Sequence, residues 1–420
     1  MADGRFLQYL AALRTDFTKL AKLEFLNEDG TVAFALDNDP KNRRSSAFLQ
    51  DGNLTCSLNN GRRRQASVTL SNLDGDFDYA VNKVWFGTQL RLWEGLLLPD
   101  GTEYMIPQGV FEIEQPNEQH KPDGNSVTYR LTDKWARLDG TLGGNLDGAY
   151  QVNAGTDIFM AMASLLRLGK YDMAPNSARP IDRIPPLFTS YYNGKTQTLT
   201  DGSSVALTTA PYDFISSEDG TVGDVMLGLA EMLAARVGYS QTGRLTVDPS
   251  QDDLLDSTKP ILWSFRQGEK QLLHAEYSMD KGGVFNDIIV VGDTLDDYTT
   301  ARGRAQNLDP KSDVCVSRIG LKTKRIHMEN YYSNDICESY AAWQLKRASV
   351  AQKTVSIECT QMFHIVENGI VTMQRDDKPG RPVERHLVQG FTRPIGQAGT
   401  MVINAVSVND FPMATIVREA

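Results

Sequence analysis

Three aspartates stand at alternate positions in one short polar stretch: Asp74, Asp76 and Asp78. Carboxylates at this spacing supply the first three ligands of a helix-loop-helix calcium site. Such a site also needs glycine at its sixth position and glutamate at its twelfth, where this chain has Tyr79 and Trp85. We therefore expect a polar turn here rather than a metal site.

The other patterns that would indicate catalysis or cofactor binding are incomplete. The five histidines are His120, His274, His327, His364 and His386, and none of them forms a local His-x-x-x-His zinc signature. The glycine-rich stretch 140–144 lacks the Gly-Lys-Ser/Thr end of a phosphate-binding loop, and no Gly-x-Ser-x-Gly elbow occurs. We expect no catalytic, cofactor-binding or metal-binding residue and no enzyme. A glycosidase pair stays open, because carboxylates are plentiful and such a pair is defined by a distance in space.

Arg62, Arg63 and Arg64 form a run of positive charge. Such a run can bind an acidic partner surface, or it can be the solvated flank of a hairpin. We prefer the second interpretation. The net charge of the whole chain is −10, which argues against specific nucleic-acid binding because that function needs a basic surface.

Length and composition limit the compartment and the number of domains. A chain of 420 residues suggests two to four domains. The four cysteines, Cys56, Cys315, Cys337 and Cys359, are far apart, so we expect them to be reduced and structural. We expect no signal peptide, because Arg5 and Arg14 lie within residues 1–22 and no clean apolar block precedes a small-residue cleavage site. We expect no membrane segment, because no run of about 18 apolar residues occurs. The protein is then made in the cytoplasm.

Patterns typical of β-strands flank the aspartate stretch and the arginine run. Ala66, Val68 and Leu70 alternate with polar residues, which is the period of a strand with one buried face. A second alternating strand starts at Gln89 and includes Trp93, which we expect in the core. Six or more short strands separated by turns within residues 22–135 favour a β-barrel or a sandwich.

The stretch 62–97 resembles the first barrel of the phage baseplate-hub (tail-tip hub) family, which includes the hub-like N-terminal part of tail-associated lysins. That family has a strand ending in L-x-N-x-D-G-x-F-D and then a G-x-x-L-x-L-W-x-G strand. The matching residues are Leu70, Asn72, Asp74, Gly75, Phe77, Asp78, Gly87, Leu90, Leu92, Trp93 and Gly95. A second match, to the F-N-x-I-x-V-x-G strand that opens the second barrel of the family, consists of Phe285, Asn286, Ile288, Val290 and Gly292.

The patterns and the resemblance together predict a mainly β chain with α+β parts, in which two tube-like β-barrel domains flank a smaller α/β domain. We expect an N-terminal helix within 1–21, a first barrel at 22–140, the α/β domain at 141–258 and a second barrel at 259–420 with an insertion around 293–350. The helix takes in residues 4–19. In the α/β domain, Thr156 or Asp157 caps one helix, and Thr221 with Asp224 forms a capping box for a second helix that ends at Gly238. We expect residues 293–332 to be an insertion or a long loop.

The resemblance implies a structural hub of a phage tail tip or of a tail-like particle, located in the virion. Family members form a homotrimer whose six barrels continue the six-fold tail tube and hold a three-fold spike or fibre. The implied partners are further copies of the chain, the tail tube or distal tail protein, the tape measure protein, and the fibre or spike. Two alternatives stay open. One is a carbohydrate-binding or carbohydrate-cleaving β-protein, indicated by Trp85, Trp93, Trp135 and the pair Tyr191-Tyr192, and the other is the hexameric distal tail ring protein.

Overall fold

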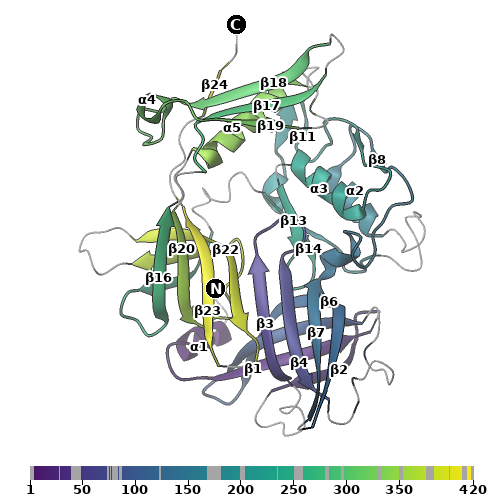
Figure 1. The fold of residues 1–420 in the computed structure, drawn as a ribbon, viewed down its shortest axis with the longest axis vertical. Helices are drawn as coiled ribbons and strands as arrows, with labels where there is room; N and C mark the ends of the chain where they lie inside the picture. Colours follow the sequence, from purple (N-terminus) through teal and green to yellow (C-terminus); the bar gives the residue numbers. More distant parts are fainter. Residues whose placement is uncertain are drawn as a thin grey trace.

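Thirteen strands form one large sheet whose order is β16-β20-β23-β22-β3-β4-β7-β6-β5-β1-β2, with β15 and β21 attached at β22 (Figure 1). The computed structural model describes residues 4–27, 29–38, 49–72, 75, 77, 84, 88–122, 124–167, 181–198, 204–233, 235–249, 259–279, 283–294, 298–328, 331, 333–349, 353–374, 383–396, 398–408 and 414–417. The predicted calcium-like turn with Asp74, Asp76 and Asp78 lies outside these residues, as do Tyr79, Trp85 and Gly87.

The first half of the sheet comes from the N-terminal third of the chain. Its strands are β1 (Thr18–Leu26), β2 (Val32–Asp37), β3 (Leu49–Ser57), β4 (Arg64–Ser71), β5 (Gln89–Leu97), β6 (Glu103–Lys121) and β7 (Gly124–Asp133). Alternating apolar residues drive their pairing. Leu23 and Phe25 on one arm and Val32, Phe34 and Leu36 on the other predict a hairpin with a turn at 28–30, and this hairpin is confirmed because Phe25 on β1 lies opposite Phe34 on β2.

The second half of the sheet comes from the C-terminal part of the chain. It contains β15 (Ile261–Arg266), β16 (Leu272–Met279), β20 (Lys353–Thr360), β21 (Ile370–Gln374), β22 (Glu384–Pro394) and β23 (Thr400–Ser407). β22 pairs antiparallel with β3, with Phe391 opposite Cys56. Gly390 permits this approach, because a Cβ atom there would lie 2.4 Å from the carbonyl oxygen of Cys56. One hydrophobic core continues beneath both halves.

The prediction of a mainly β chain is confirmed. The two separate tube-like barrels are not confirmed, because the described strands form one continuous path with β16 and β2 at its ends and the sheet does not close. The domain boundaries expected from the sequence stay predictions.

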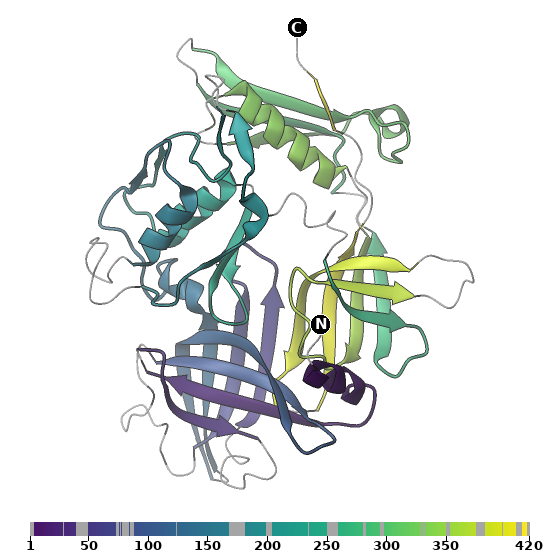
Figure 2. The ribbon, with the colours of Figure 1, turned by 180° about the vertical axis from the view of Figure 1, so that it is seen from behind.

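The N-terminal helix is shorter than its predicted range of 4–19. Helix α1 (Gly4–Ala12) ends before β1, which pairs with β5 from Thr18 onward. The ladder with β5 supplies hydrogen bonds and packing that outweigh local helix preference in this segment. Tyr9 and Leu13 are buried, and α1 lies beside the strands of the second half (Figure 2).

A middle unit follows β7 and has its own core. Its elements are η1 (Lys134–Arg137), β8 (Gln151–Val152), α2 (Ile158–Leu166), β9 (Leu187–Phe188), η2 (Ser190–Tyr192), β10 (Thr196–Thr198), β11 (Ser204–Ala206), β12 (Phe214–Ile215), α3 (Val222–Met232), β13 (Ala235–Tyr239) and β14 (Leu245–Pro249). Asp157 caps α2, and Thr221 with Asp224 forms the capping box of α3, so both predicted helix starts are confirmed.

The predicted end of α3 at Gly238 is wrong. The helix ends at Met232 with Leu233 as its C-cap, and Gly238 lies within β13. Its lack of a side chain serves packing instead, because a Cβ atom there would lie 2.4 Å from Nε of Arg63.

A third unit occupies the range in which we expected an insertion or a long loop. Strands β17 (Asp287–Thr294), β18 (Thr300–Asn307), β19 (Thr323–His327) and β24 (Ala414–Ile416) form a sheet in the order β19-β17-β18-β24. Helices α4 (Val316–Ile319) and α5 (Asn334–Ala348) complete it, and α5 packs against β17 and β18 (Figure 2). Of the two alternatives expected for residues 293–332, the long loop is therefore wrong, and the range belongs to a separate sheet, of which β17, β18 and β19 lie between β16 and β20 in the chain. The strand containing Gly292 pairs within this separate sheet and not with the second half of the large sheet.

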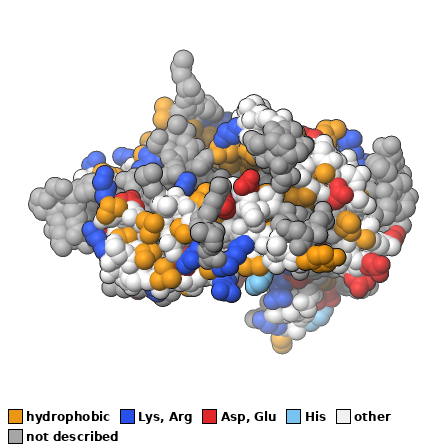
Figure 3. Space-filling view, turned by 90° about the horizontal axis from the view of Figure 1, so that it is seen from above, with side chains coloured by type: hydrophobic (Ala, Val, Ile, Leu, Met, Phe, Trp, Pro, Cys, Tyr) orange, Lys and Arg blue, Asp and Glu red, His pale blue; other side chains and the backbone are white. Residues whose placement is uncertain are grey.

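No described helix is both long and apolar enough to span a lipid bilayer. On the face of the molecule seen in Figure 3, basic side chains are scattered among apolar ones, and acidic side chains gather mainly toward one end.

Candidate functional site

A buried polar junction joins the two halves of the large sheet. Arg393 on β22 donates from Nε to Oε2 of Glu94 on β5 over 2.9 Å, and its Nη2 lies 2.8 Å from the same oxygen. Both side chains are 0% exposed. Gln108 on β6 accepts a further hydrogen bond from Arg393. Breaking a buried ion pair leaves an uncompensated charge, which is strongly unfavourable. The pair between Arg393 and Glu94 therefore holds β22 and β5 in one arrangement.

A second ion pair extends this junction. Arg64 on β4 pairs with Glu367, and its Nη1 donates to the carbonyl of Gln108 over 2.9 Å. Burial alone would raise the pKa of Glu367, but Arg64 and Arg63 lower it below its usual value. We use the name buried junction for Arg64, Glu94, Gln108, Glu367 and Arg393.

The buried junction has the chemistry of a structural clamp. Lys19 adds its Nζ 3.3 Å from Oε1 of Glu94, and burial lowers the pKa of Lys19 to about 8. Each carboxylate is enclosed and paired with an arginine, so neither Glu94 nor Glu367 has the solvent access that an acid or base for sugar cleavage needs.

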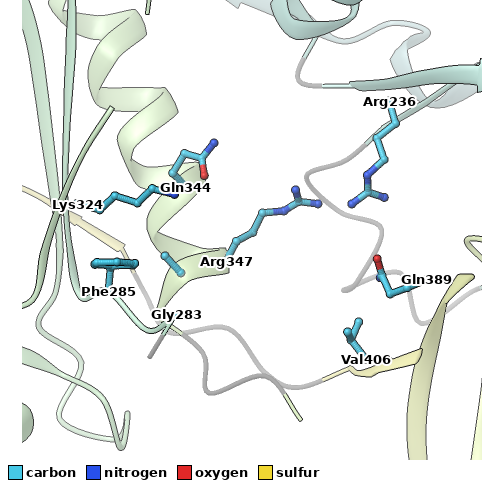
Figure 4. A pocket seen from close by; sticks show the side chains of 9 residues that line it. Arg236, Gly283, Phe285, Lys324, Gln344, Arg347, Gln389 and Val406 are labelled. Carbon is cyan, nitrogen blue, oxygen red and sulfur yellow. The ribbon is translucent and has the colours of Figure 1, made fainter. Parts of the chain in front are cut away.

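A basic pocket of about 320 Å³ opens where the middle unit, the third unit and the second half of the sheet meet (Figure 4). Its cations are Arg236 on β13, Lys324 on β19 and Arg347 on α5. In Figure 4 the two guanidinium groups point toward one another, with Gln389 below them. The described lining contains no Asp, Glu, His, Cys, Ser or Thr side chain. The pocket can therefore attract an anionic group, but its described residues offer no hydroxyl or thiol nucleophile and no carboxylate base.

The structure keeps the predicted histidines and cysteines apart. His120, His274 and His327 are exposed, while His364 and His386 are buried in different places. Among the described residues no three His, Cys, Asp or Glu side chains gather as metal ligands would. All four cysteines are buried and unpaired, as expected for structural thiols.

Two of the three consecutive arginines contradict the expectation of a solvated flank. Arg63 and Arg64 are buried, and only Arg62 is partly exposed, in an ion pair with Asp139. These two arginines do not support the alternative, binding to an acidic partner surface, either. Arg63 pairs with Asp248 and Arg64 pairs with Glu367 within the same chain. The strand pattern contains the signal that we missed, since Arg64 continues the inward series of Ala66, Val68 and Leu70.

The expectation of Trp93 in the core is also wrong. Leu90, Leu92 and Leu96 face the core, whereas Trp93 lies on the opposite face, half-buried, and donates from Nε1 to Glu24 over 2.8 Å. The two-residue period of a strand requires this, and it also places Glu94 inward. The aromatic residues that indicated a carbohydrate-binding protein do not gather around Trp93, because Trp135 and Tyr192 are buried in the core of the middle unit.

The sequence matches no family model and none of the curated proteins with which it was compared. Solved structures do match. The tail protein from Neisseria meningitidis MC58 is similar at a TM-score of 0.58 and 10% identity, over 93% of this chain and 97% of that one. The 43 kDa tail protein of prophage MuSo2 from Shewanella oneidensis is similar at 0.55 and 12%, over 92% and 98%. Prophage tail protein gp18 from Listeria monocytogenes EGD-e is similar at 0.52 and 8%, over 93% and 94%. The chain thus has the fold of phage tail proteins, and the resemblance seen in its sequence is confirmed at the level of the fold.

Proposed function

We propose that this chain is a structural hub at the tail tip of a phage or of a related tail-like particle. Three copies close into a ring. Each copy contributes two tube-like β parts, the two halves of the large sheet, so six positions continue the six-fold tail tube. The ring then offers three-fold symmetry to a spike or fibre, and its other neighbours are the tail tube or distal tail protein and the tape measure protein.

The observation that carries this proposal is the extent of the likeness to tail proteins. It covers at least 92% of this chain and at least 94% of each of the three tail proteins. Because the likeness includes the large sheet, the middle unit and the third unit together, it concerns a whole architecture. Identities of 8–12% make this an argument from fold, so the role is a proposal.

The ends of the large sheet support assembly into a ring. In the part of the chain that is described, β2 pairs with β1 alone and β16 with β20 alone. Val32 on β2 is 47% exposed and Leu273 on β16 is 53% exposed. Open strand edges with apolar side chains tend to pair with another chain, and a closed ring covers them without leaving a growing end.

The buried junction supports a rigid role. A tail tip transmits force between the tube and the spike, and paired buried charges keep the two halves of each subunit in register. The net charge of −10 suits a channel through which DNA slides without binding, because the negative charges of the protein and the DNA repel one another.

Imaging of intact particles with an antibody fragment or a tag on this chain tests the proposal. We expect three copies on the tail axis at the tip. Six copies in the ring would indicate the distal tail ring protein, and a location on a peripheral fibre would exclude the hub. Purified protein that cleaves a polysaccharide, with activity lost on changing one carboxylate, would contradict a purely structural role.

A further inference from the structure

The loop between β18 and β19 exposes three large apolar side chains. Leu308 is 47% exposed, Ile319 at the end of α4 is 42% exposed, and Leu321 is 53% exposed. Single exposed apolar residues are common on protein surfaces, but several in one short loop are typical of a surface that another molecule covers. We use the name knob for residues 308–325, which include this loop and the start of β19.

Buried hydrogen bonds hold the knob in one shape. Asn286 is 0% exposed, and its Nδ2 donates to the carbonyl of Val314 over 3.1 Å and to that of Gly320 over 2.7 Å. Its Oδ1 accepts from the N–H of Lys322 over 2.7 Å, and its carbonyl accepts from the N–H of Asn307 over 2.9 Å. Each of the three apolar residues is next in the chain to a residue bonded to Asn286, so their side chains stay near one another. A loop that is already ordered loses little conformational entropy when it binds.

The charge of the knob is mainly positive. Arg318 and Asp313 neutralise one another in an ion pair of 2.6 Å. The other carboxylate of the knob belongs to Asp309, whose Oδ1 accepts from the backbone N–H of the residue two positions later. Three further cations are exposed and make no ion pair within the described part of the chain: Lys311, Lys324 and Arg325. The knob thus combines an apolar patch with an excess of positive charge, although the net charge of the chain is −10.

A surface of the opposite charge lies on the middle unit. Segments 144–154 and 213–224 run side by side there, with Phe214 paired to Val152. They contain no Lys or Arg, and Ile215 between them is 56% exposed. Their carboxylates are all exposed: Asp147, Asp213, Glu218, Asp219 and Asp224. We use the name acidic face for these two segments.

The knob and the acidic face lie on opposite flanks of the molecule. In Figure 1 the loop with α4 lies at the left end of the third unit, whereas β8, which belongs to the acidic face, lies at the right of the middle unit. Figure 2 shows the same separation from behind. The knob therefore cannot reach the acidic face of its own copy. A contact between two different surfaces on opposite flanks is heterologous, and such contacts close into rings.

We propose that the knob of one copy binds the acidic face of a neighbouring copy of this chain. Leu308, Ile319 and Leu321 pack around Ile215, and the cations of the knob lie beside the carboxylates. Charge complementarity favours a second copy as the occupant, because the chain itself carries the acidic and partly apolar surface that the knob needs. The contact rests on the proposed function in that it joins the copies of the proposed ring, and it adds to the open strand edges of the large sheet.

Two charge-reversed variants test this contact. The first carries Lys311→Glu and Arg325→Glu in the knob, and the second carries Glu218→Lys and Asp219→Lys in the acidic face. Sedimentation velocity over a range of concentrations should show self-association of the unchanged protein. Each variant alone should associate at least about tenfold more weakly, because like charges then meet. An equimolar mixture of the two variants should associate as the unchanged protein does, because each reversed surface then meets its opposite.

A matched pair of leucines tests the apolar part of the contact. Leu321→Asp should weaken association at least about tenfold, because the apolar contact of a half-exposed leucine is lost. The control is Leu187→Asp on β9, which is 52% exposed and lies outside the acidic face, and it should associate as the unchanged protein does. The melting temperature of every variant is measured to show that it is folded.

The results that overturn the contact differ from those that overturn the hub. An unchanged protein that stays monomeric at every concentration would exclude a second copy as the occupant. A mixture that associates no better than its separate variants would exclude the pairing of the knob with the acidic face. Three copies imaged at the tail tip beside either result would leave the hub in place with another contact between its subunits. Restored association of the mixture with six copies in the ring would keep the contact and reject the hub.

Discussion

The hydroxyl of Tyr9 donates to Nδ1 of His364 over 3.1 Å and so ties helix α1 to the segment that follows β20. The direction of this hydrogen bond follows from its neighbours. Nε2 of His364 lies 3.1 Å from the carbonyl of Leu262, which can only accept, so Nε2 carries the proton. The backbone N–H of Phe363 donates to the hydroxyl of Tyr9 over 3.0 Å. With a neutral imidazole the Tyr9 hydroxyl is the donor to Nδ1, and protonation of the ring would reverse that hydrogen bond.

Acid should therefore weaken the folded protein through His364. Burial lowers the pKa of His364 from 6.5 to about 4, so the stability that this residue provides is complete above pH 6.5 and is lost as the pH falls toward 4. Between about pH 7 and about pH 4.5 the expected loss is roughly 2.5 kcal/mol. Burial lowers the pKa of His386 as well, whereas burial raises the pKa of Asp133 to about 6 and acts in the opposite direction.

The contribution of His364 can be isolated with His364→Gln. Urea unfolding of both proteins across this pH range gives the difference in their unfolding free energies, in which His386 and Asp133 cancel. The difference should shrink as the pH falls. A difference that does not depend on pH would show that His364 is not held neutral.

The ion pair of Arg393 and Glu94 gives a second prediction. Arg393→Met should lower the free energy of unfolding by about 3–5 kcal/mol, because it leaves the Glu94 carboxylate buried without its main partner. Adding Glu94→Leu should restore part of this loss. The control is Asp313→Asn, at an exposed ion pair with Arg318, which should leave stability nearly unchanged. Equal effects of the buried and the exposed change would contradict the description of the buried junction.

The two faces of β5 give a third prediction. Leu92→Ala should cost about 2–5 kcal/mol, because it leaves a cavity in the core. Trp93→Ala should cost less although it removes a larger side chain, because Trp93 lies half-buried on the other face and loses mainly its hydrogen bond to Glu24. Thermal unfolding of the two variants decides the order, and a reversed order would place Trp93 in the core after all.

Close packing of α5 on β18 gives a fourth prediction. A Cβ atom on Gly303 would lie 2.2 Å from the backbone of Cys337, so Gly303→Ala should force α5 away from the sheet and cost about 1–3 kcal/mol. The matched control is Gly4→Ala, where nothing lies within 4 Å of the added atom. Hydrogen exchange of α5 measures the effect, and unchanged protection would contradict the packing.

The same glycine explains why strand β18 could not be predicted. β18 turns Ala301, Gly303 and Ala305 inward and places Arg302 and Arg304 on its other face. These inward residues are small because α5 packs closely against them, so the strand shows no large apolar residue by which a sequence pattern could reveal it. The β1–β2 hairpin and the helix caps were predictable because they depend on neighbours in the chain.

The buried junction was hidden for a different reason. Arg64 and Glu94 occupy inward positions of their strands, but charged residues at such positions suggest a surface when each strand is considered alone. Their partners, Glu367 and Arg393, are about 300 residues distant in the chain. A local pattern contains no information about a partner at that separation, so only the fold could identify the pair.

The pairing of β3 with β22 has a consequence for synthesis on the ribosome. Strand β3 emerges early, yet the strand that covers its edge ends at Pro394. Until β22 has been synthesised the edge of β3 therefore lacks its partner, and an uncovered edge invites pairing with other nascent chains. The large sheet can be completed only after β22 and β23 have been synthesised, so its assembly should be slow.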